Sequence, residues 1–137
     1  YVPTDAHQIG RAVARMNRRL RQERQSELTP TQLSVLGSVR RLRSATPSAI
    51  AARERVQPPS ITRTLSSLAE AGLIVREPHP EDGRQVLISV SDEGLRVLDE
   101  ENGRRDLWLS HRLADLTVAE RTTVREAAAL LERLAQS

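Results

Sequence analysis

The side chains of this chain that could do chemistry are hydroxyl, carboxylate and guanidinium groups in two neighbouring stretches. Ser60, Thr62 and Arg63 lie together in the first stretch, and Asp82 and Arg84 lie two positions apart in the second. Hydroxyl and guanidinium groups donate hydrogen bonds, and the guanidinium stays positively charged at any physiological pH. Such groups bind polar and anionic ligands, so the elements that position them decide what they bind.

Catalytic groups in a recognised arrangement are missing from the sequence. The three histidines, His7, His79 and His111, are far apart, and none has an HExxH or similar metal-binding spacing. The sequence contains no Gly-x-Ser-x-Gly elbow, no glycine-rich phosphate loop and no cysteine, which excludes a thiolate metal site. We therefore expect no enzymatic activity, no cofactor and no bound metal.

The first stretch is predicted to form a helix from about Pro59 to Ala71. Its apolar residues fall within about 60° of one another at the helical period: Ile61, Leu65 and Leu68. The opposite face is polar and carries Arg63, Ser66, Ser67 and Glu70. Prolines suit a helix start, and Gly72 suits the residue just beyond the end. One face is therefore predicted to enter the core, and the other is free to bind.

The second stretch is predicted to form a β-hairpin with a charged tip. Leu73 to Arg76 is a short apolar run, and after turn residues at Pro78, Pro80 and Asp82-Gly83 the apolar residues recur every second position, at Val86, Ile88 and Val90. An arginine on such a tip can enter a narrow, electronegative DNA minor groove. An ordinary solvated hairpin is the alternative.

Two further helices are predicted upstream. Thr29-Pro30-Thr31-Gln32 has the pattern of a capping box and opens a helix to about Arg43, whose apolar stripe is Leu33, Leu36, Val39 and Leu42. Thr46-Pro47 opens a short helix to about Arg55, with Ile50 and Ala51 directed inward. A short helix, a tight turn and a polar-faced helix form a helix-turn-helix, whose second helix reaches base edges in the major groove.

Together these segments resemble the MarR family of bacterial transcription regulators over nearly the whole chain. The strongest local matches are Pro59-Ser60-Ile61-Thr62-Arg63 through Leu68, Gly72-Leu73-Ile74, and the wing residues Asp82 and Arg84. The resemblance implies a mainly α fold with a small β-hairpin wing. It also implies a homodimer that binds double-stranded DNA at a pseudo-palindromic operator, acts as a repressor, and is released by a small amphipathic or phenolic ligand.

Carried onto this sequence, the resemblance assigns roles to individual residues. The major-groove contacts would be Pro59, Ser60, Thr62, Arg63 and Thr64, and Arg84 would enter the minor groove with Asp82 supporting the wing through an ion pair. Hydroxyl groups near a helix start can instead bond their own backbone. Further candidates for phosphate contacts are Arg40, Arg41, Arg43, Arg53, Arg55, Ser66 and His79, although arginines near a helix C-terminus are also favourable without any ligand.

The two ends of the chain are predicted to be helical and to form the dimer. Ile9, Val13, Met16 and Leu20 form a stripe near the start, and Thr117 to Glu120 has the pattern of a capping box that opens a last helix. A long helix from Ser91 is anchored by Leu95 and Leu98, and its polar middle, from Asp99 to Asp106, is expected to cross solvent. The predicted interface residues are Ile9, Val13, Trp108, Leu113, Val124, Ala127, Leu130, Leu131 and Leu134. Burial of these residues within one chain is the alternative.

The domain plan is therefore a dimerisation region at 1–28 and 92–137 around a winged helix-turn-helix at 29–91, with the recognition helix at about 58–71 and the wing at about 73–90. The net charge of +3 over 137 residues is weak support for nucleic acid, because residues 46–90 hold five arginines and five acids. No apolar run approaches the roughly 20 residues that span a bilayer, and we expect a cytoplasmic protein. A winged-helix module that binds a protein partner instead of DNA is the alternative function.

Overall fold

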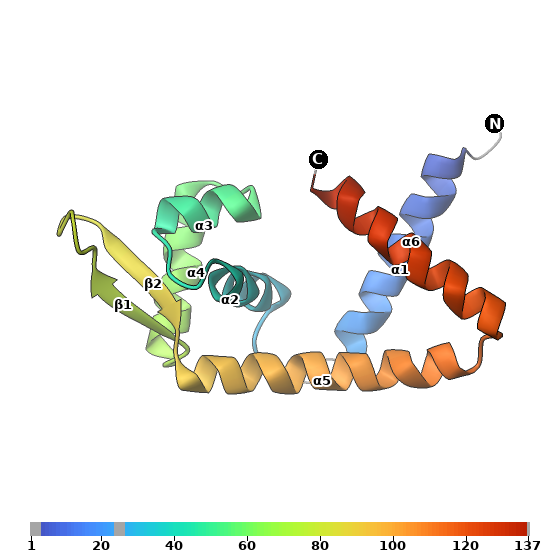
Figure 1. Cartoon of the computed structure of the whole chain (residues 1–137). Coiled ribbons are helices and arrows are strands. Elements are labelled where there is room, and N and C mark those ends of the chain that lie inside the picture. Colours follow the sequence, from blue (N-terminus) through green and yellow to red (C-terminus); the bar gives the residue numbers. More distant parts are fainter. Residues whose placement is uncertain (1–3, 24–26, 137) are drawn as a thin grey trace. The chain divides into compact units, whose positions relative to one another are not determined.

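The computed structural model describes residues 4–23 and 27–136 (Figure 1). Its elements are α1 (Asp5–Glu23), α2 (Pro30–Leu42), α3 (Pro47–Glu54), α4 (Pro58–Glu70), β1 (Ile74–Pro78), β2 (Val86–Val90), α5 (Asp92–Ala114) and α6 (Val118–Ala135). These elements form two compact units. One contains residues up to Glu23 and from Arg104 onward, and the other contains the residues between them, so that α5 contributes to both.

The predicted helix caps are present. The Thr29 hydroxyl accepts the N–H of Gln32 at 3.1 Å, and the Gln32 side chain accepts the N–H of Thr29 at 2.8 Å. Thr46 accepts the N–H of Ala49 at 3.2 Å at the start of α3. These bonds satisfy donors that a helix start leaves without a partner, which explains why both helices begin where the sequence predicts.

The core of the second unit lies where α2, α3 and α4 pack against one another and against the β-hairpin. The predicted inward face of α4 is confirmed, because Ile61, Leu65 and Leu68 are all buried. Leu36 from α2 and Ile50 from α3 are fully buried in the same cluster. This packing holds α4 through its apolar face and leaves its polar face in solvent.

The hairpin pairs β1 with β2 in antiparallel register, from Ile74 opposite Val90 to Pro78 opposite Val86. Ile88 also forms a β-bridge with Ala45, which precedes α3. Of the three alternating apolar residues of β2, only Ile88 is buried, whereas Val86 is exposed. The ribbon is anchored where it crosses Ala45, and the half nearer the tip extends away from the core.

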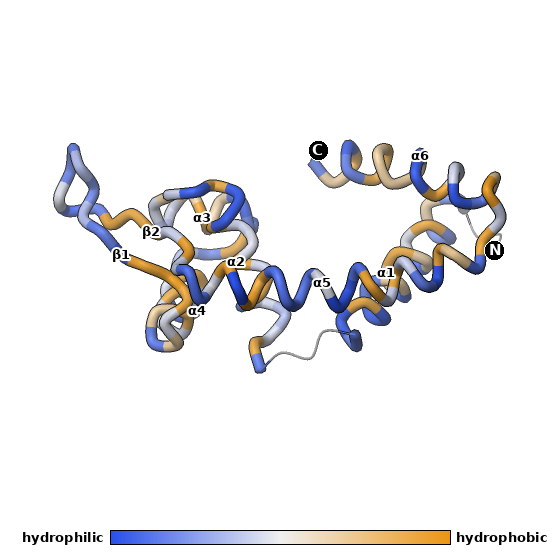
Figure 2. Tube along the Cα trace, turned by 60° about the horizontal axis from the view of Figure 1, so that its bottom comes forward, coloured by the Kyte–Doolittle hydropathy of each residue, from blue (hydrophilic) through white to orange (hydrophobic). Residues whose placement is uncertain are grey.

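The terminal unit leaves most of its apolar side chains in solvent. Apolar residues recur along α1 and α6 (Figure 2), yet neither helix contains a buried residue. Ile9 is 50% exposed and Leu134 is 68% exposed. The capping box predicted at Thr117 and Glu120 is present. Within this unit, the apolar faces of α1 and α6 are therefore not buried.

The polar middle of α5 differs from the prediction at one position. Glu101 was expected in a segment that crosses solvent, but only 3% of its surface is exposed. The buried residues of α5 are Gly94, Leu98 and Glu101, at the i, i+4, i+7 spacing that places side chains on one helix face. Helical position therefore decides the burial of Glu101, although its charge suggested otherwise.

Candidate DNA-binding surface

The first turns of α4 present a polar and accessible surface. Ser60, Thr62 and Arg63 are all exposed. The Thr62 hydroxyl donates to the carbonyl of Pro58, and the Thr64 hydroxyl donates to the carbonyl of Ser60, each at 3.1 Å. The internal bonding expected as an alternative thus occurs for the two threonines. Their oxygens can still accept a hydrogen bond, whereas donation to a ligand requires the hydroxyl to rotate.

Arg63 is the only basic residue of α4, and Glu70 at the other end of the helix is the only acid. The positive charge therefore lies near the N-terminus, on the same side of the helix as the exposed hydroxyl groups. The macrodipole of a helix also places partial positive charge at its N-terminus. This end of α4 is consequently suited to anions and to the acceptor atoms of base edges.

The tip of the hairpin is built from two turns capped by side chains. His79 lies directly after β1, and its Nδ1 accepts the N–H groups of Glu81 at 3.1 Å and of Asp82 at 3.3 Å. The next turn closes with the N–H of Gln85 donating to the carbonyl of Asp82 at 3.0 Å. His79 was predicted as a surface or phosphate contact. In the structure it is half-buried and one ring nitrogen orders the tip.

Arg84 projects from this ordered tip. Its side chain is 93% exposed, and its Nε lies 3.3 Å from Oδ1 of Asp82, so the predicted ion pair is present. The same oxygen accepts the backbone N–H of Arg84 at 3.1 Å. Asp82 therefore holds both the backbone and the first guanidinium nitrogen of Arg84. The terminal nitrogens at the end of the side chain extend toward solvent.

One contact between the hairpin and α4 was not predicted from the sequence. Arg76 in β1 donates from Nη2 to the Ser66 hydroxyl at 3.4 Å. In the structure the Ser66 hydroxyl accepts this bond from the wing, and the phosphate contact expected of it stays a prediction. Residues two apart in a strand share one face, so the alternation from the buried Ile74 could have placed Arg76 on the side of the helix.

The predicted phosphate-contacting arginines have different surroundings. Arg40 is already paired, with its Nη1 at 2.8 Å from Oδ1 of Asp99 on α5. Arg43 and Arg55 end α2 and α3 with positive φ angles of 67° and 56°. Arg41 and Arg53 are exposed in the last turns of the same helices. Only Arg53 and Arg55 belong to the helix-turn-helix itself.

Other site types find no support among the residues that the structure describes. No three His, Asp or Glu side chains within residues 4–23 and 27–136 gather in a way that could hold a metal ion. The helices described do not include one with both the length and the apolar character needed to cross a membrane.

Known proteins share this arrangement of helix-turn-helix and wing. The sequence profile of the MarR family matches residues 28–86. An HTH-type transcriptional regulator of Mycobacterium bovis is 44% identical over 127 residues, which cover 92% of this chain and 89% of that protein. The chain belongs to the MarR family of transcriptional regulators. A second family relative, the transcriptional repressor MdtR of Bacillus subtilis, is 33% identical over 80% of this chain and 69% of its own length.

Solved structures of transcriptional regulators, MarR among them, have the same fold. A transcriptional regulator from Pseudomonas aeruginosa superposes with a TM-score of 0.84 at 36% identity, and the match covers 98% of this chain and 99% of that one. A MarR variant from E. coli complexed with operator DNA superposes with a TM-score of 0.67 at 25% identity, over 92% of each chain. Membership of the MarR family favours DNA over a protein partner as the ligand of the polar helix and wing.

Proposed function

We propose that the chain is a homodimeric repressor that binds a pseudo-palindromic DNA operator. In this proposal the N-terminal turns of α4 enter the major groove and Arg84 enters the adjacent minor groove. The observation that carries the proposal is the position of Arg84, which is 93% exposed at a tip already ordered by Asp82 and His79. An arginine held in this way loses little conformational freedom on binding.

The division of labour within the surface follows from its chemistry. Hydrogen bonds to base edges give sequence preference, and contacts to phosphates give affinity that falls with salt. Arg63 and the exposed Ser60 lie where they can contact base edges, whereas Arg41 and Arg53 at the helix ends are suited to phosphates. Because residues 46–90 have no net charge, the proposal depends on this placement and not on bulk attraction.

The proposed dimer is supported by the exposed apolar faces of the terminal helices. Val124, Leu130, Leu131 and Leu134 on α6 and Ile9 and Val13 on α1 are all more than one third exposed. Contiguous apolar surface of this kind is typical of a protein interface. Trp108, Leu113 and Ala127 are half-buried beside it. A two-fold dimer would present two copies of α4 to half-sites about 10 to 10.5 base pairs apart.

Selection of bound sequences from random duplex DNA tests the proposal directly. A palindromic consensus supports the dimeric operator, whereas no enrichment favours a protein partner. With the selected operator, Arg84→Ala should lower affinity by about 1–3 kcal/mol, the range of a specific contact. Arg112→Ala is the matched control, because Arg112 is an exposed arginine of α5 outside this surface. Unchanged affinity for Arg84→Ala would disprove the role of the wing.

Arg63→Ala distinguishes a base contact from a phosphate contact. If Arg63 reads a base, the substitution changes the selected consensus at one position in each half-site as well as the affinity. If Arg63 binds a phosphate, the affinity falls equally for all sequences and the salt dependence becomes shallower by about one unit of slope per arginine. Ser60→Ala in parallel tests the hydroxyl beside it.

We also propose that a small amphipathic or phenolic ligand releases the operator. Such a ligand can act only through its different affinity for the DNA-bound and the released conformations. Trp108, the single tryptophan of the chain, lies half-buried in α5 and gives a direct readout. Titration with hydroxybenzoate-type anions should change its fluorescence and weaken operator binding over the same concentration range.

A further inference from the structure

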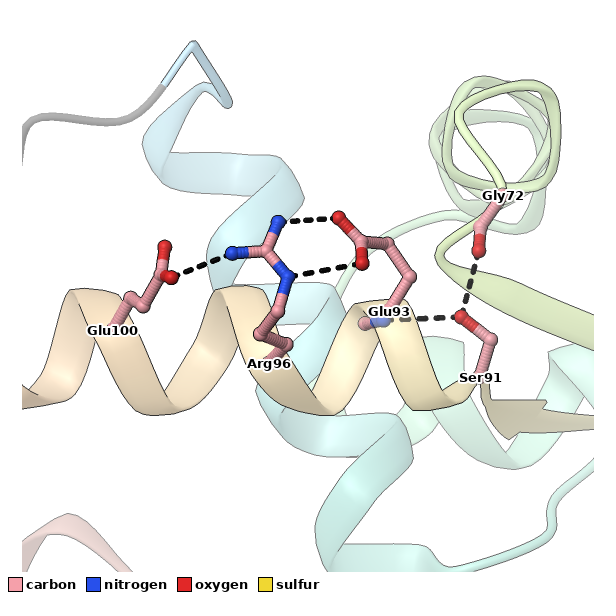
Figure 3. A network of polar contacts seen from close by, with 6 residues as sticks. Gly72, Ser91, Glu93, Arg96 and Glu100 are labelled. Atoms are coloured by element: carbon pink, nitrogen blue, oxygen red, sulfur yellow. Dashed lines mark hydrogen bonds and ion pairs between the residues drawn. The ribbon is translucent and has the colours of Figure 1, made fainter.

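The C-terminal end of α4 and the N-terminal end of α5 are joined by one side chain (Figure 3). Gly72, which follows α4, has a φ of 75°, and its carbonyl accepts the hydroxyl of Ser91 at 2.6 Å. The same hydroxyl accepts the N–H of Gly94 at 3.0 Å and so caps α5. In addition, the N–H of Ser91 donates to the carbonyl of Leu73 at 3.0 Å. Ser91 therefore ties the end of one helix to the start of the next.

Gly94 lets the two backbones approach closely at this junction. A Cβ atom at this position would lie 2.2 Å from the carbonyl oxygen of Leu73 and 2.6 Å from Cγ1 of Val90. Both distances are far inside van der Waals contact, and the nearer atom belongs to the backbone. Any side chain at Gly94 must therefore push α5 away from the segment that ends α4.

The first turns of α5 are further reinforced on the solvent side. Arg96 donates from Nε to Glu93 at 3.0 Å, contacts the second oxygen of the same carboxylate, and pairs with Glu100 at 2.5 Å (Figure 3). These residues are three and four positions apart, the spacing at which side chains on a helix meet. These ion pairs stabilise the first turns of α5, which meet the end of α4.

We propose that Ser91 and Gly94 are positioning residues that set the angle between α4 and α5. The inference rests on the proposed DNA-binding function of α4. The junction lies at the C-terminal end of α4, whereas the proposed base contacts lie at its N-terminal end. A helix of 13 residues is about 20 Å long, so a tilt of about 10° at the junction moves the first turn by about 3 Å. That displacement removes hydrogen bonds to base edges but leaves α4 folded.

The absence of cysteine allows the angle to be measured with spin labels. Ser67→Cys on α4 and Ser110→Cys on α5 introduce two exposed attachment sites into a chain that contains no cysteine. Labelled protein diluted into unlabelled protein reports the distance within one chain by pulsed electron resonance. Gly94→Ala should shift this distance by about 2–3 Å. Gly103→Ala is the matched control, because a Cβ there meets no atom within 4 Å.

Operator binding provides the second readout. Gly94→Ala and Ser91→Ala should each lower operator affinity at least about tenfold, the effect of losing one or two base contacts, while affinity for unrelated duplex DNA stays unchanged. A purely structural defect would weaken both. Ser91→Thr keeps the hydroxyl and should restore both the distance and the operator affinity.

The possible results separate this inference from the proposed function. Wild-type label distances and wild-type operator affinity in Gly94→Ala and Ser91→Ala would overturn the positioning role. If Gly94→Ala fails to fold, the comparison of Ser91→Ala with Ser91→Thr decides the question alone. If the wild-type protein selects no operator, the proposed function fails, and the label distances still decide whether the junction sets the helix angle.

Discussion

His79 offers the sharpest test of how the wing works. Its Nδ1 accepts the N–H groups of Glu81 and Asp82 at 3.1 and 3.3 Å, and Asp82 is the first residue of the turn that carries Arg84. His79→Ala leaves both N–H groups to water and removes the restraint on the tip. We expect the tip to sample open conformations in which Arg84 no longer points in one direction. The β-strands behind it keep their backbone pairing.

The size of the effect follows from the two lost bonds. A hydrogen bond of this kind contributes about 0.5–1.5 kcal/mol net. Because both N–H groups share the single lone pair of Nδ1, the two bonds together contribute about 1–2 kcal/mol, and ordering the tip becomes harder by that amount. That free energy must be supplied when DNA binds, which lowers the affinity by about 5- to 30-fold for each wing, because 1.4 kcal/mol is a factor of ten. The free energy of global unfolding should change little, since the tip lies outside the core.

Fluorescence anisotropy with a labelled operator measures this effect in five proteins: wild type, His79→Ala, His79→Asn, Arg84→Ala and the double variant His79→Ala/Arg84→Ala. The amide oxygen of asparagine can accept the same N–H groups, so His79→Asn should bind almost as tightly as wild type. If His79 acts only by ordering Arg84, the double variant should bind no more weakly than Arg84→Ala. The two substitutions would then be strongly non-additive.

A direct contact between His79 and DNA predicts a different pattern. In that case His79→Ala would lower the affinity by the same factor with and without Arg84, and asparagine would not compensate unless it reached the same phosphate. Additivity in this cycle would refute the positioning role of His79. A fall in the melting temperature similar to that of a core substitution would refute the claim that the effect is confined to the tip.

Two further predictions concern an ion pair and a helix cap. Asp99→Asn breaks the pair with Arg40, whose side chain is 43% exposed, while that of Asp99 is 65% exposed. An ion pair with this much solvent access contributes little, so the free energy of unfolding in urea should fall by less than about 1 kcal/mol. If the released Arg40 contacts a phosphate, the salt dependence of operator binding should steepen by about 0.9 units of slope. The pKa of Glu120 lies below its ordinary value of 4.5, mainly because the backbone N–H of Thr117 donates a hydrogen bond to the carboxylate, with a smaller contribution from the Thr117 side chain. The stabilisation is therefore complete above about pH 4.5 and is lost as the pH falls through the lowered pKa, so urea midpoints at pH 7 and pH 3 should differ less in Glu120→Gln than in wild type.

The elements that the sequence predicted well are those determined by local chemistry. Thr29 with Gln32, and Thr117 with Glu120, are reciprocal caps that depend on residues three positions apart. The inward face of α4 follows from the helical period alone. Such patterns specify where a helix begins and which side it buries, without information about the rest of the chain.

The contacts that could not be predicted join segments distant in sequence or depend on details of one ring. Ser91 binds Gly72, 19 positions earlier in the sequence. Ala45 pairs with Ile88, although no sequence pattern near either residue predicts a β-bridge between them. The burial of Glu101 differs from the prediction because its position on the helix face of Gly94 and Leu98 outweighs the tendency of a carboxylate to stay in solvent. At His79, the residue type indicated a polar contact. Which atoms it would meet depended on the folded turn.

These unpredicted contacts also bear on how salt should affect the regulator. Ser91 and His79 fix α4 and the wing tip through hydrogen bonds between uncharged groups, and such bonds respond weakly to ionic strength. The exposed pair between Asp82 and Arg84 is screened by salt, but the bond from the backbone N–H of Arg84 to Asp82 holds the same turn. The geometry of the surface should therefore persist as salt is raised. It follows that the slope of log affinity against log salt should count only the cationic side chains that displace counterions from the DNA. Because Arg84 in the electronegative minor groove would be one of them, Arg84→Ala should make this slope shallower, whereas His79→Ala in the Arg84→Ala background should not change it.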